Sequence, residues 1–471
     1  MIDADQSLQP ADLLDALTRH WEASATAIRK IDDSCPPGSA SPVFTVGGAY
    51  RAQGWTEWTQ GFQHGAAFLQ FDATGEASFL ELGRKRTLEV MAPHLTHTGV
   101  HDHGFNNVST YGNLWRLGNE GKIDLPEHER NYAELALKVT GAVQASRWKQ
   151  TADGTGYVYS FNGPQSLFID TIRTMRALSL AHLLGHRLSH EGDAVANLLD
   201  RSIEHAINTA RHVIWYGGDD DGELRDAYDV RGRTAHEALF NTNNGAFRAP
   251  STQQGYSPFS TWTRGQAWAM VGFPEQLEFL DACVTDEELE VHGGRHEVER
   301  IYAEAAEAVC DHYLENTPTD GIPYWDTGAP GLAKMGDWGS RPADPFNDHE
   351  PVDSSAAAIG AQGLLRMADW LDAEDAVRDE NGNAERYRAA GLTITRTLLG
   401  DAYLSTDPDH EGLLLHSVYH RPNGWDHVPA GRKVPCGEAC MWGDYHLREL
   451  AVVVGRMAEA DSVPHRFFGP V

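Results

Sequence analysis

The sequence predicts an all-α protein, an (α/α)6 toroid with short β excursions in the loops. Helical periodicity dominates the chain and recurs in about a dozen segments of ordinary helix length, separated by turns rich in Gly, Pro and Asp. Strand patterns are short and lie between the helical segments. Because helix follows helix through short connections, consecutive helices are expected to pair as hairpins. A ring of such hairpins, with an inner and an outer helix in each, fits this order, and its loops at one end would build the site.

The elements are expected in the following order. Helices are predicted over residues 10–30, 58–73, 77–92, 106–117, 129–145, 167–186, 194–215, 264–283, 296–315, 354–371, 384–399 and 443–458. Short strands are predicted over residues 156–161, 237–247 and 413–420, the second with a hairpin turn at 243–245. Residues 1–471 are interpreted as one catalytic domain. Charged or Pro-rich and Gly-rich stretches near 284–295 and 336–351 are interpreted as surface insertions.

The charge balance narrows the class of partner. The chain carries 68 acidic against 38 basic residues, a formal net charge of −30, and such a surface repels nucleic acid and anionic membranes. An acidic, Lys-poor composition suits a high-salt cytoplasm, or else reflects a GC-rich genome that favours Arg codons; the sequence leaves both open.

The cellular location and the oligomeric state are predicted from features that the sequence lacks. No apolar run has membrane-spanning length, and the N-terminal region lacks the features of a secretory signal. The five scattered cysteines do not form a disulfide framework. We therefore expect a cytoplasmic protein, a monomer or small homo-oligomer, that binds neither nucleic acid nor membranes.

Two aspartates are the candidates for acid–base chemistry. Asp102 lies in the run His101–Phe105, and Asp170 interrupts the apolar run Ser166–Ile172. An ionised carboxylate is costly to bury, so each must be paired, open to a cavity or raised in pKa. A raised pKa is what a general acid needs.

The segment that leads into the helix at 264–283 is rich in binding groups. The hydroxyls of Ser260, Thr261 and Thr263 could cap this helix, and its N-terminus with Arg264 would form an anion site suited to a carboxylate. Trp268 and a neighbouring tryptophan offer faces for a sugar ring. A capped helix with core tryptophans explains the same pattern equally well.

Other polar residues admit both functional and structural interpretations. A neutral His236, near Gln254 in the sequence, could bond hydroxyls and carboxylates, although a lone histidine is more often structural. The triplet at 101–103 contains metal-ligand types, but adjacent side chains rarely point at one ion, so neither a metal nor a cofactor is expected. Asp326, Asp353 and Asp444 stand at helix starts or turns and are expected to cap backbone N–H groups.

With these motifs in view, the chain resembles the unsaturated glucuronyl hydrolases of glycoside hydrolase family 88. The matching runs follow the family's order and cover nearly the whole chain, at residues 58–62, 101–105, 169–170, 260–268, 323–326, 353–358 and 442–445. Members of that family are (α/α)6 barrels that need no metal. They remove a 4,5-unsaturated uronic acid from the non-reducing end of oligosaccharides left by polysaccharide lyases.

The resemblance implies roles for individual residues. Asp170 matches the family's general acid/base, and Asp102 matches its second essential carboxylate. Protonation of C4 in the substrate's enol ether would create an oxocarbenium-like cation at C5, which water then attacks. A charged Asp102 is expected to hold up the pKa of Asp170 and to stabilise that cation. The positions that match the lining of the family's substrate pocket are Trp58, His101, His236, Gln254, Arg264 and Trp268.

Departures from the family pattern are expected to affect substrate preference and not the reaction. Phe161 stands where many members carry Trp, so we include it among the substrate-binding residues. Gln253 stands where members often have His, and His103 and the pair 106–107 also differ from the common continuation.

The expected substrate is therefore an oligosaccharide with a 4,5-unsaturated uronyl end. One alternative is an unsaturated rhamnogalacturonyl hydrolase, which has the same ring and chemistry but a different leaving sugar. A cofactor-free sugar epimerase on a similar ring would call for a histidine pair that the motifs do not supply. A sugar-binding protein without activity is disfavoured because both Asp102 and Asp170 are intact.

Overall fold

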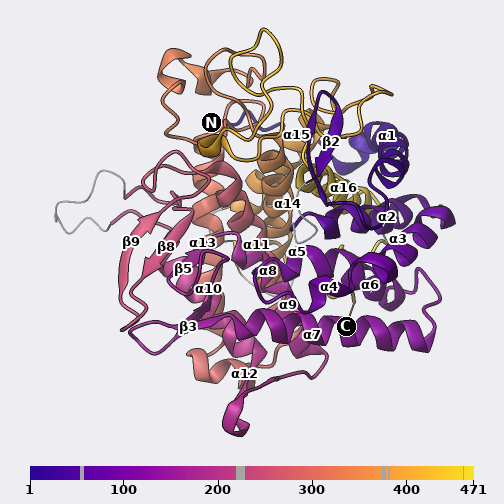
Figure 1. Ribbon diagram of the computed structural model, residues 1–471. Helices are drawn as coiled ribbons and strands as arrows, with labels where there is room; N and C mark the ends of the chain where they lie inside the picture. The colour runs from indigo at the N-terminus through magenta and orange to yellow at the C-terminus, as the bar shows by residue number, and fades with distance from the viewer. Residues whose placement is uncertain (53–57, 219–228, 374–377, 380–381, 460, 471) are drawn as a thin grey trace.

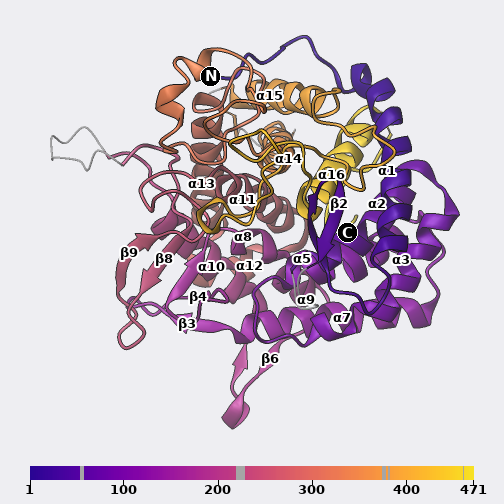
Figure 2. The ribbon, with the colours of Figure 1, turned by 45° about the horizontal axis from the view of Figure 1, so that its top comes forward.

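The computed structural model describes residues 1–52, 58–218, 229–373, 378–379, 382–459 and 461–470, and its main helices form two concentric rings (Figures 1 and 2). The inner ring consists of α2 (Gln60–Thr74), α5 (His103–Asn107) with α6 (Asn113–Asn119), α8 (Thr171–Thr174) with α9 (Arg176–Leu183), α11 (Thr263–Cys283), α14 (Ser354–Leu371) and α16 (Met441–Met457). The outer ring consists of α1 (Leu14–Ser34), α3 (Ala77–Val90), α7 (Glu127–Ser146), α10 (Leu198–Val213), α13 (Arg295–Glu315) and α15 (Asn383–Leu398).

The inner ring closes on itself. Going round the ring, α2 packs on α5, α5 on α8, α8 on α11, α11 on α14, α14 on α16, and α16 back on α2. Glycines allow the closest of these contacts: a Cβ on Gly61 would lie 2.2 Å from the carbonyl oxygen of Asn106, and one on Gly363 would lie 2.3 Å from that of Met270. The closed circuit confirms the predicted toroid.

Burial distinguishes the two rings. Every residue of α14 except Asp369 is buried, whereas the buried residues of α1 recur at three- or four-residue spacing from Leu17 to Ile31. A helix that is apolar or small all round belongs inside, and one with a single apolar stripe belongs at the surface. The main hydrophobic core accordingly fills the space between the rings.

The strands lie in the loops between helices, as predicted. They form four small antiparallel sheets: β1 (Pro42–Val46) with β2 (Ala49–Ala52), β3 (Trp148–Gln150) with β4 (Gly156–Val158), β6 (Leu188–Ser189) with β7 (Val195–Ala196), and a three-stranded sheet of β5 (Ser166–Phe168), β8 (Glu237–Phe240) and β9 (Phe247–Ser251). The predicted hairpin turn at 243–245 joins β8 to β9, and Gly245 there has a φ of +72°.

Two predictions of local structure are wrong. Residues 413–420 form no strand, because the N–H groups of Leu413 and Leu414 donate to the Asp444 carboxylate and His416 has a φ of 66°. The helix predicted over residues 167–186 begins instead as β5, which pairs with β8, and continues as α8 and α9. Asp170 therefore lies at a strand-to-helix junction.

The stretches interpreted as insertions are local structures near the surface. The first contains α12 (Asp286–Leu289), which Thr285 and Glu288 begin as a capping box. The second is built from turns and a short 3-10 helix at Trp338–Ser340. A further short helix, α4 (Ala92–Leu95), precedes α5. Within the described ranges, no helix combines the length and the apolar character needed to cross a membrane.

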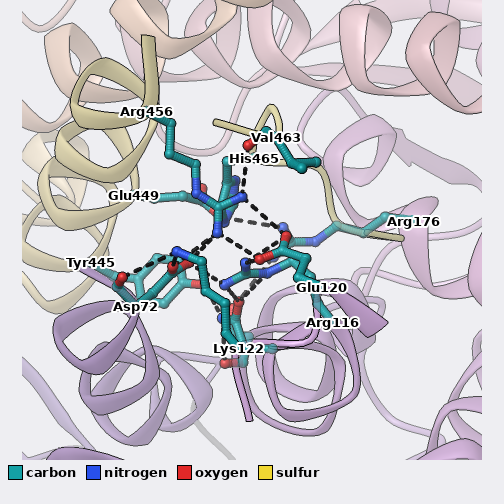
Figure 3. A network of polar contacts seen from close by, with 12 residues as sticks. Asp72, Arg116, Glu120, Lys122, Arg176, Tyr445, Glu449, Arg456, Val463 and His465 are labelled. Carbon is teal, nitrogen blue, oxygen red and sulfur yellow. Dashed lines mark hydrogen bonds and ion pairs between the residues drawn. The ribbon is translucent and has the colours of Figure 1, made fainter. Parts of the chain in front are cut away.

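A buried ionic network joins the far ends of α2 and α16 (Figure 3). Asp72 lies near the end of α2, and its side chain is fully buried; it pairs with Arg456 of α16 at 2.8 Å and with Arg116 of α6 at 2.8 Å. Both arginines also pair with Glu120, at 2.6 and 2.9 Å. The charges satisfy one another because each carboxylate meets two guanidinium groups. The network therefore fastens the first helices of the chain to the last one.

Candidate active site

A cavity of about 540 Å³ opens at the end of the ring where the inner helices begin. The structure brings all the substrate-binding and catalytic candidates together in its lining: Trp58, His101, Asp102, Phe161, Asp170, His236, Gln254, Arg264 and Trp268. Asp102 immediately precedes α5, Asp170 immediately precedes α8, and Arg264 lies in the first turn of α11. The partial positive charge of these helix N-termini favours anions in the cavity.

Neither candidate aspartate serves as a helix cap. Both occupy N-cap positions, but neither makes the side-chain hydrogen bond that such a position usually provides. Asp102 is 7% exposed and Asp170 is 8% exposed, and both carboxyl groups face the cavity lining. Their side chains are therefore available for another task.

His101 lies between the two carboxyl groups. Its Nε2 is 3.6 Å from Oδ1 of Asp170 and 3.9 Å from Oδ1 of Asp102. Its Nδ1 accepts a hydrogen bond from the backbone N–H of Phe161 at 3.3 Å, so the proton of the neutral ring must be on Nε2. One N–H group thus faces both acids.

The three groups shift one another's pKa values. Burial raises the pKa of Asp102, with Asp170 adding to the effect and His101 opposing it. Burial also opposes the ionisation of Asp170, but the nearby N–H group and charge of His101 outweigh it and hold the pKa of Asp170 below its usual range. The pKa of His101 is raised because the two aspartates outweigh its burial. The pKa directions are therefore opposite to those expected from the sequence, and the proton resides more readily on Asp102.

His236 is a neutral donor beside this group. Its Nδ1 accepts from the N–H groups of Gln253 at 2.9 Å and Gln254 at 3.2 Å, which places the proton on Nε2. Burial lowers the pKa of His236 to about 4. Its Nε2 is buried without a hydrogen-bond partner, and its ring is close enough to Asp170 for each to shift the other's pKa. A ligand oxygen near Asp170 would satisfy this donor.

Arg264 is already bound to protein groups, which corrects the expectation that it forms an open anion site. Nη1 donates to Asp353 at 2.8 Å and to the carbonyl of Val418, and Nη2 donates to Gln254 Oε1 at 2.8 Å and to the carbonyl of Tyr419 at 2.7 Å. The guanidinium carbon lies over the rings of Trp262 and Trp442, 4.7 and 4.9 Å from their centroids. Arg264 therefore orients Gln254 at the edge of the cavity.

The hydroxyls expected to cap α11 fasten neighbouring loops instead. Ser260 Oγ donates to the carbonyl of Ser257, Thr261 Oγ1 accepts from the N–H of Thr234, and Thr263 Oγ1 donates to the carbonyl of Tyr324. No side chain caps the helix at its N-cap residue, Trp262.

The three aspartates assigned to capping bind backbone N–H groups as expected. Asp353 caps α14 by accepting from Ser355 at 3.1 Å. Asp326 accepts from Tyr256 and Gly328, each at 2.8 Å. Asp444 accepts from the N–H groups of residues 413 and 414.

Aromatic side chains form the cavity walls. Trp58 stacks on Trp442 with ring centroids 4.9 Å apart, and Trp268 is buried against Phe105 at 4.8 Å. Phe161 is 59% exposed and lies parallel to the ring of His101 at 6.2 Å. The first two pairs are fixed by packing, whereas Phe161 presents an open face to whatever enters.

Several lining residues were not among the sequence candidates. They are His97, Gly99, Val100, Asn162, Phe168, Tyr419, His420, Asn423 and Trp425. The last four belong to a loop that begins at the end of the wrongly predicted strand. The turn-forming run Pro422–Gly424, flanked by histidine and tryptophan, was the signal that could have identified it.

Other side chains of metal-ligating types make local contacts. His103, in the triplet at 101–103, bonds through Nε2 to the carbonyl of His97 at 2.9 Å. Cys440 accepts from the N–H of Gly443 at 3.4 Å, and Cys436 is a separate free thiol. Across the described part of the chain, no three His, Cys, Asp or Glu side chains are grouped as a metal site would need.

Comparison with known proteins identifies proteins that are similar to this chain in sequence and in fold. No family model matches the chain. It is 27% identical over 409 residues to an unsaturated glucuronyl hydrolase of Bacillus sp. (strain GL1), covering 85% of this chain and 87% of that protein. It is 26% identical over 409 residues to an unsaturated chondroitin disaccharide hydrolase of Streptococcus pyogenes serotype M1, covering 84% of this chain and 80% of that protein. The crystal structure of the unsaturated glucuronyl hydrolase of Bacillus sp. GL1 superposes with a TM-score of 0.67 at 23% identity, covering 94% of this chain and 98% of that one. The shared fold is thus the helical ring described above.

Proposed function

We propose that this chain, which is similar to unsaturated glucuronyl hydrolases, is a glycoside hydrolase that releases a 4,5-unsaturated uronic acid from the non-reducing end of lyase-generated oligosaccharides. The observation that carries the proposal is the arrangement of Asp102, Asp170 and His101. Two buried carboxyl groups face one cavity, free of capping duties, with a single N–H group between them. Such a group can hold one proton and deliver it.

The reaction needs that proton at C4 of the enol ether. Asp170 donates it, which leaves a cation at C5 stabilised by the ionised Asp102. The resulting Asp170 carboxylate then takes a proton from a water molecule as that water attacks C5. The hydrated product is a hemiketal whose ring opens and releases the leaving sugar without further assistance.

Substrate binding supplies the shift that Asp170 requires. Without substrate charge beside it, the pKa of Asp170 lies below its usual range. The substrate's own carboxylate, held by Nε2 of His236 and the amide of Gln254, adds a negative charge beside Asp170 and expels water. Both effects raise the pKa of Asp170 and draw the proton to it from Asp102. A second assignment, with Asp102 as the donor, is favoured by the raised pKa of Asp102.

Infrared difference spectroscopy distinguishes the two assignments. A saturated substrate analogue, which cannot react, is bound to the protein, and the band of the protonated carboxyl group is recorded. We expect this band to be lost in Asp170→Asn and kept in Asp102→Asn. Loss in Asp102→Asn alone would assign the donor role to Asp102.

The activity itself is measured as the loss of enol-ether absorbance on incubation with unsaturated disaccharides. We expect decay with the unchanged protein and a fall in kcat of about 10²- to 10⁴-fold in Asp170→Asn, the usual range for a lost general acid. Asp401→Asn is the matched control, because the Asp401 side chain is 95% exposed and should leave the rate unchanged. No decay with any such substrate would contradict the proposed function, and full activity in Asp170→Asn would contradict the role of that residue.

We place the reaction in the cytoplasm. All five cysteines lie within the described residues and all are free thiols, the state that a reducing compartment maintains. A sulfhydryl titration of protein purified under non-reducing conditions should find five thiols after unfolding.

A further inference from the structure

Arg147 is a buried arginine that the mechanism above does not use. It directly follows α7 and is 5% exposed. All three nitrogen atoms of its guanidinium donate to backbone carbonyls: Nε to that of Tyr159 at 3.0 Å, Nη1 to that of Thr98, and Nη2 to that of Ser160 at 2.6 Å. The guanidinium carbon also lies over the ring of Tyr159, 4.4 Å from its centroid. None of these partners is a carboxylate, so this buried charge serves to hold backbone in place.

The carbonyls bound by Arg147 belong to two segments that line the cavity. Thr98 directly precedes the lining residues 99–101, and Ser160 directly precedes the lining residues 161 and 162. The planar fork of a guanidinium sets the directions of its N–H groups, so its acceptors are held in one geometry. Arg147 therefore fixes these two segments relative to each other.

The peptide group between Ser160 and Phe161 connects Arg147 to His101. Its carbonyl oxygen accepts from Nη2 of Arg147 at 2.6 Å, and its N–H donates to Nδ1 of His101 at 3.3 Å. Because a peptide group is planar, a fixed carbonyl also fixes the direction of the N–H. A cation on the carbonyl polarises the group and strengthens the N–H as a donor. Nδ1 of His101 can accept from this donor only while it carries no proton.

The charges around His101 favour a second proton on its ring. Burial opposes that proton, but Asp102 and Asp170 outweigh burial and raise the pKa of His101, and Arg147 acts against the two aspartates. His205, which also acts on this ring, is uncharged at neutral pH because burial lowers its pKa to about 3. A second proton on the ring would sit on Nδ1, against the peptide N–H. The held peptide group therefore opposes the aspartates.

We infer that Arg147 is a positioning residue, which acts through the peptide group of residues 160 and 161 to keep His101 neutral, with its one proton on Nε2 between the two acids. The inference rests on the proposed function, in which a single N–H group faces both carboxyl groups. Arg147 is not among the described residues that line the cavity. It therefore acts on His101 and not on the substrate.

The ring nitrogens of His101 test the inference directly. Protein labelled with ¹⁵N in histidine is measured by NMR at pH 7 without substrate, and the His101 resonances are assigned by their loss in His101→Gln. In the unchanged protein we expect the Nδ1 resonance of an unprotonated nitrogen. In Arg147→Met it should move towards that of a protonated nitrogen, because the other tautomer or the doubly protonated ring becomes populated, and both carry a proton on Nδ1.

Arg201→Met is the matched control. Nη1 of Arg201 donates to the carbonyl of Ala145 at 2.5 Å, and its guanidinium carbon lies 4.9 Å from the centroid of the Trp148 ring. Arg201 thus binds a backbone carbonyl and an aromatic ring as Arg147 does, but neither of these partners lines the cavity. This variant should leave the Nδ1 resonance of His101 unchanged.

The kinetics with an unsaturated disaccharide give a second readout. Arg147→Met should lower kcat by about 10-fold or more, since a misplaced proton-transfer group slows the reaction, and should change KM much less. Arg147→Lys keeps the charge but offers one donor atom in place of three. We expect it to shift the Nδ1 resonance and lower kcat in the same directions as Arg147→Met but by smaller amounts. It takes the place of Arg147→Met if circular dichroism shows that the methionine variant does not fold.

Three results would overturn the inference. They are a protonated Nδ1 in the unchanged protein, an unchanged Nδ1 resonance in a folded Arg147 variant, and a loss of kcat no larger than that in Arg201→Met. Each of them leaves hydrolysis itself intact. Absence of turnover by the unchanged protein would instead contradict the proposed function, and the nitrogen resonances would still show whether Arg147 controls the protonation of His101.

Discussion

Replacing Arg264 by methionine tests the conclusion that this arginine organises the site. Methionine keeps much of the length and volume of the side chain but removes the charge and the hydrogen bonds. Arg264 and Asp353 are 1% and 0% exposed in their side chains, and the ion pair between them is 2.8 Å long. Arg264→Met therefore leaves a buried carboxylate without its counter-charge.

The expected cost can be worked out from these contacts. Removing one partner of a buried ion pair typically costs about 3–5 kcal/mol, because the other charge stays desolvated and uncompensated. The carbonyls of Val418 and Tyr419 also lose their donors. We expect a decrease in the free energy of unfolding of about 3–5 kcal/mol, measured by urea titration, which is a large part of the stability of a typical protein.

A second variant separates the charge from the packing. Asp353→Asn keeps an oxygen to cap Ser355 but removes the negative charge, so the double variant Arg264→Met/Asp353→Asn has no unpaired carboxylate. We expect the double variant to regain about 2 kcal/mol or more relative to Arg264→Met alone. If the double variant is no more stable than the single one, the unpaired charge is not the source of the cost and the reasoning fails.

The same substitution should change the kinetics in a defined way. Gln254 and the loop at 419–426 both lose their bond to Arg264, so the substrate is held less well. We expect a higher KM for the unsaturated disaccharide at a pH and temperature where Arg264→Met is still folded, as judged by circular dichroism. An unchanged KM in the folded variant would contradict the role of Arg264 in orienting Gln254.

Two further predictions concern protonation and the far end of the ring. The chemistry needs one proton on the acid pair, and the pKa of Asp102 is raised, so kcat/KM should fall as the pH rises through that pKa. In Asp102→Asn the proton must be held by Asp170, whose pKa is lowered, so this alkaline limb of the pH profile should move to lower pH; an unchanged limb would assign it to another group. Arg456→Met should lower the free energy of unfolding by about 2–4 kcal/mol in urea titrations at pH 7, somewhat less than a fully broken pair, because Asp72 and Glu120 each keep Arg116. The arginines outweigh burial and hold the pKa of Asp72 well below its usual range. The stability that the ion pair contributes is therefore fully present above the pKa of an unfolded aspartate, about 4, and is lost as the pH falls further. The difference in unfolding free energy between the unchanged protein and Arg456→Met should narrow below that pH, and a constant difference would contradict the pairing.

The helices could be predicted from the sequence because each one depends mainly on residues that are close together in the chain. Helical periodicity and Asp-rich, Gly-rich turns placed helices at 354–371 and 264–283 with errors of at most one residue. The strand β5 was missed because its pairing with β8 joins residues far apart in the sequence. A short apolar run does not indicate such a pairing, because the same run fits a helix equally well.

The candidate site was predictable to the extent that its residues are individually unusual. Asp102 and Asp170 were identified because an acid in an apolar setting needs an explanation. The partner of Arg264 was not, since Asp353 lies 89 positions away and fits a helix cap by itself. The pKa directions depend on burial and on how near His101 lies to each aspartate. These distances are set by the fold, which the pattern of side chains does not reveal.

The closure of the inner ring has a consequence for how the protein is made. Helix α2, near the start of the chain, is completed only by α16, near its end: Trp58 stacks on Trp442 beside the cavity, and Asp72 pairs with Arg456 at the opposite end. A ribosome synthesises the chain from its N-terminus, so the side of α2 that packs on α16 stays exposed to solvent through most of translation. A nascent chain therefore has no complete substrate cavity until its last helix docks, and this long interval is when chaperones would be most needed.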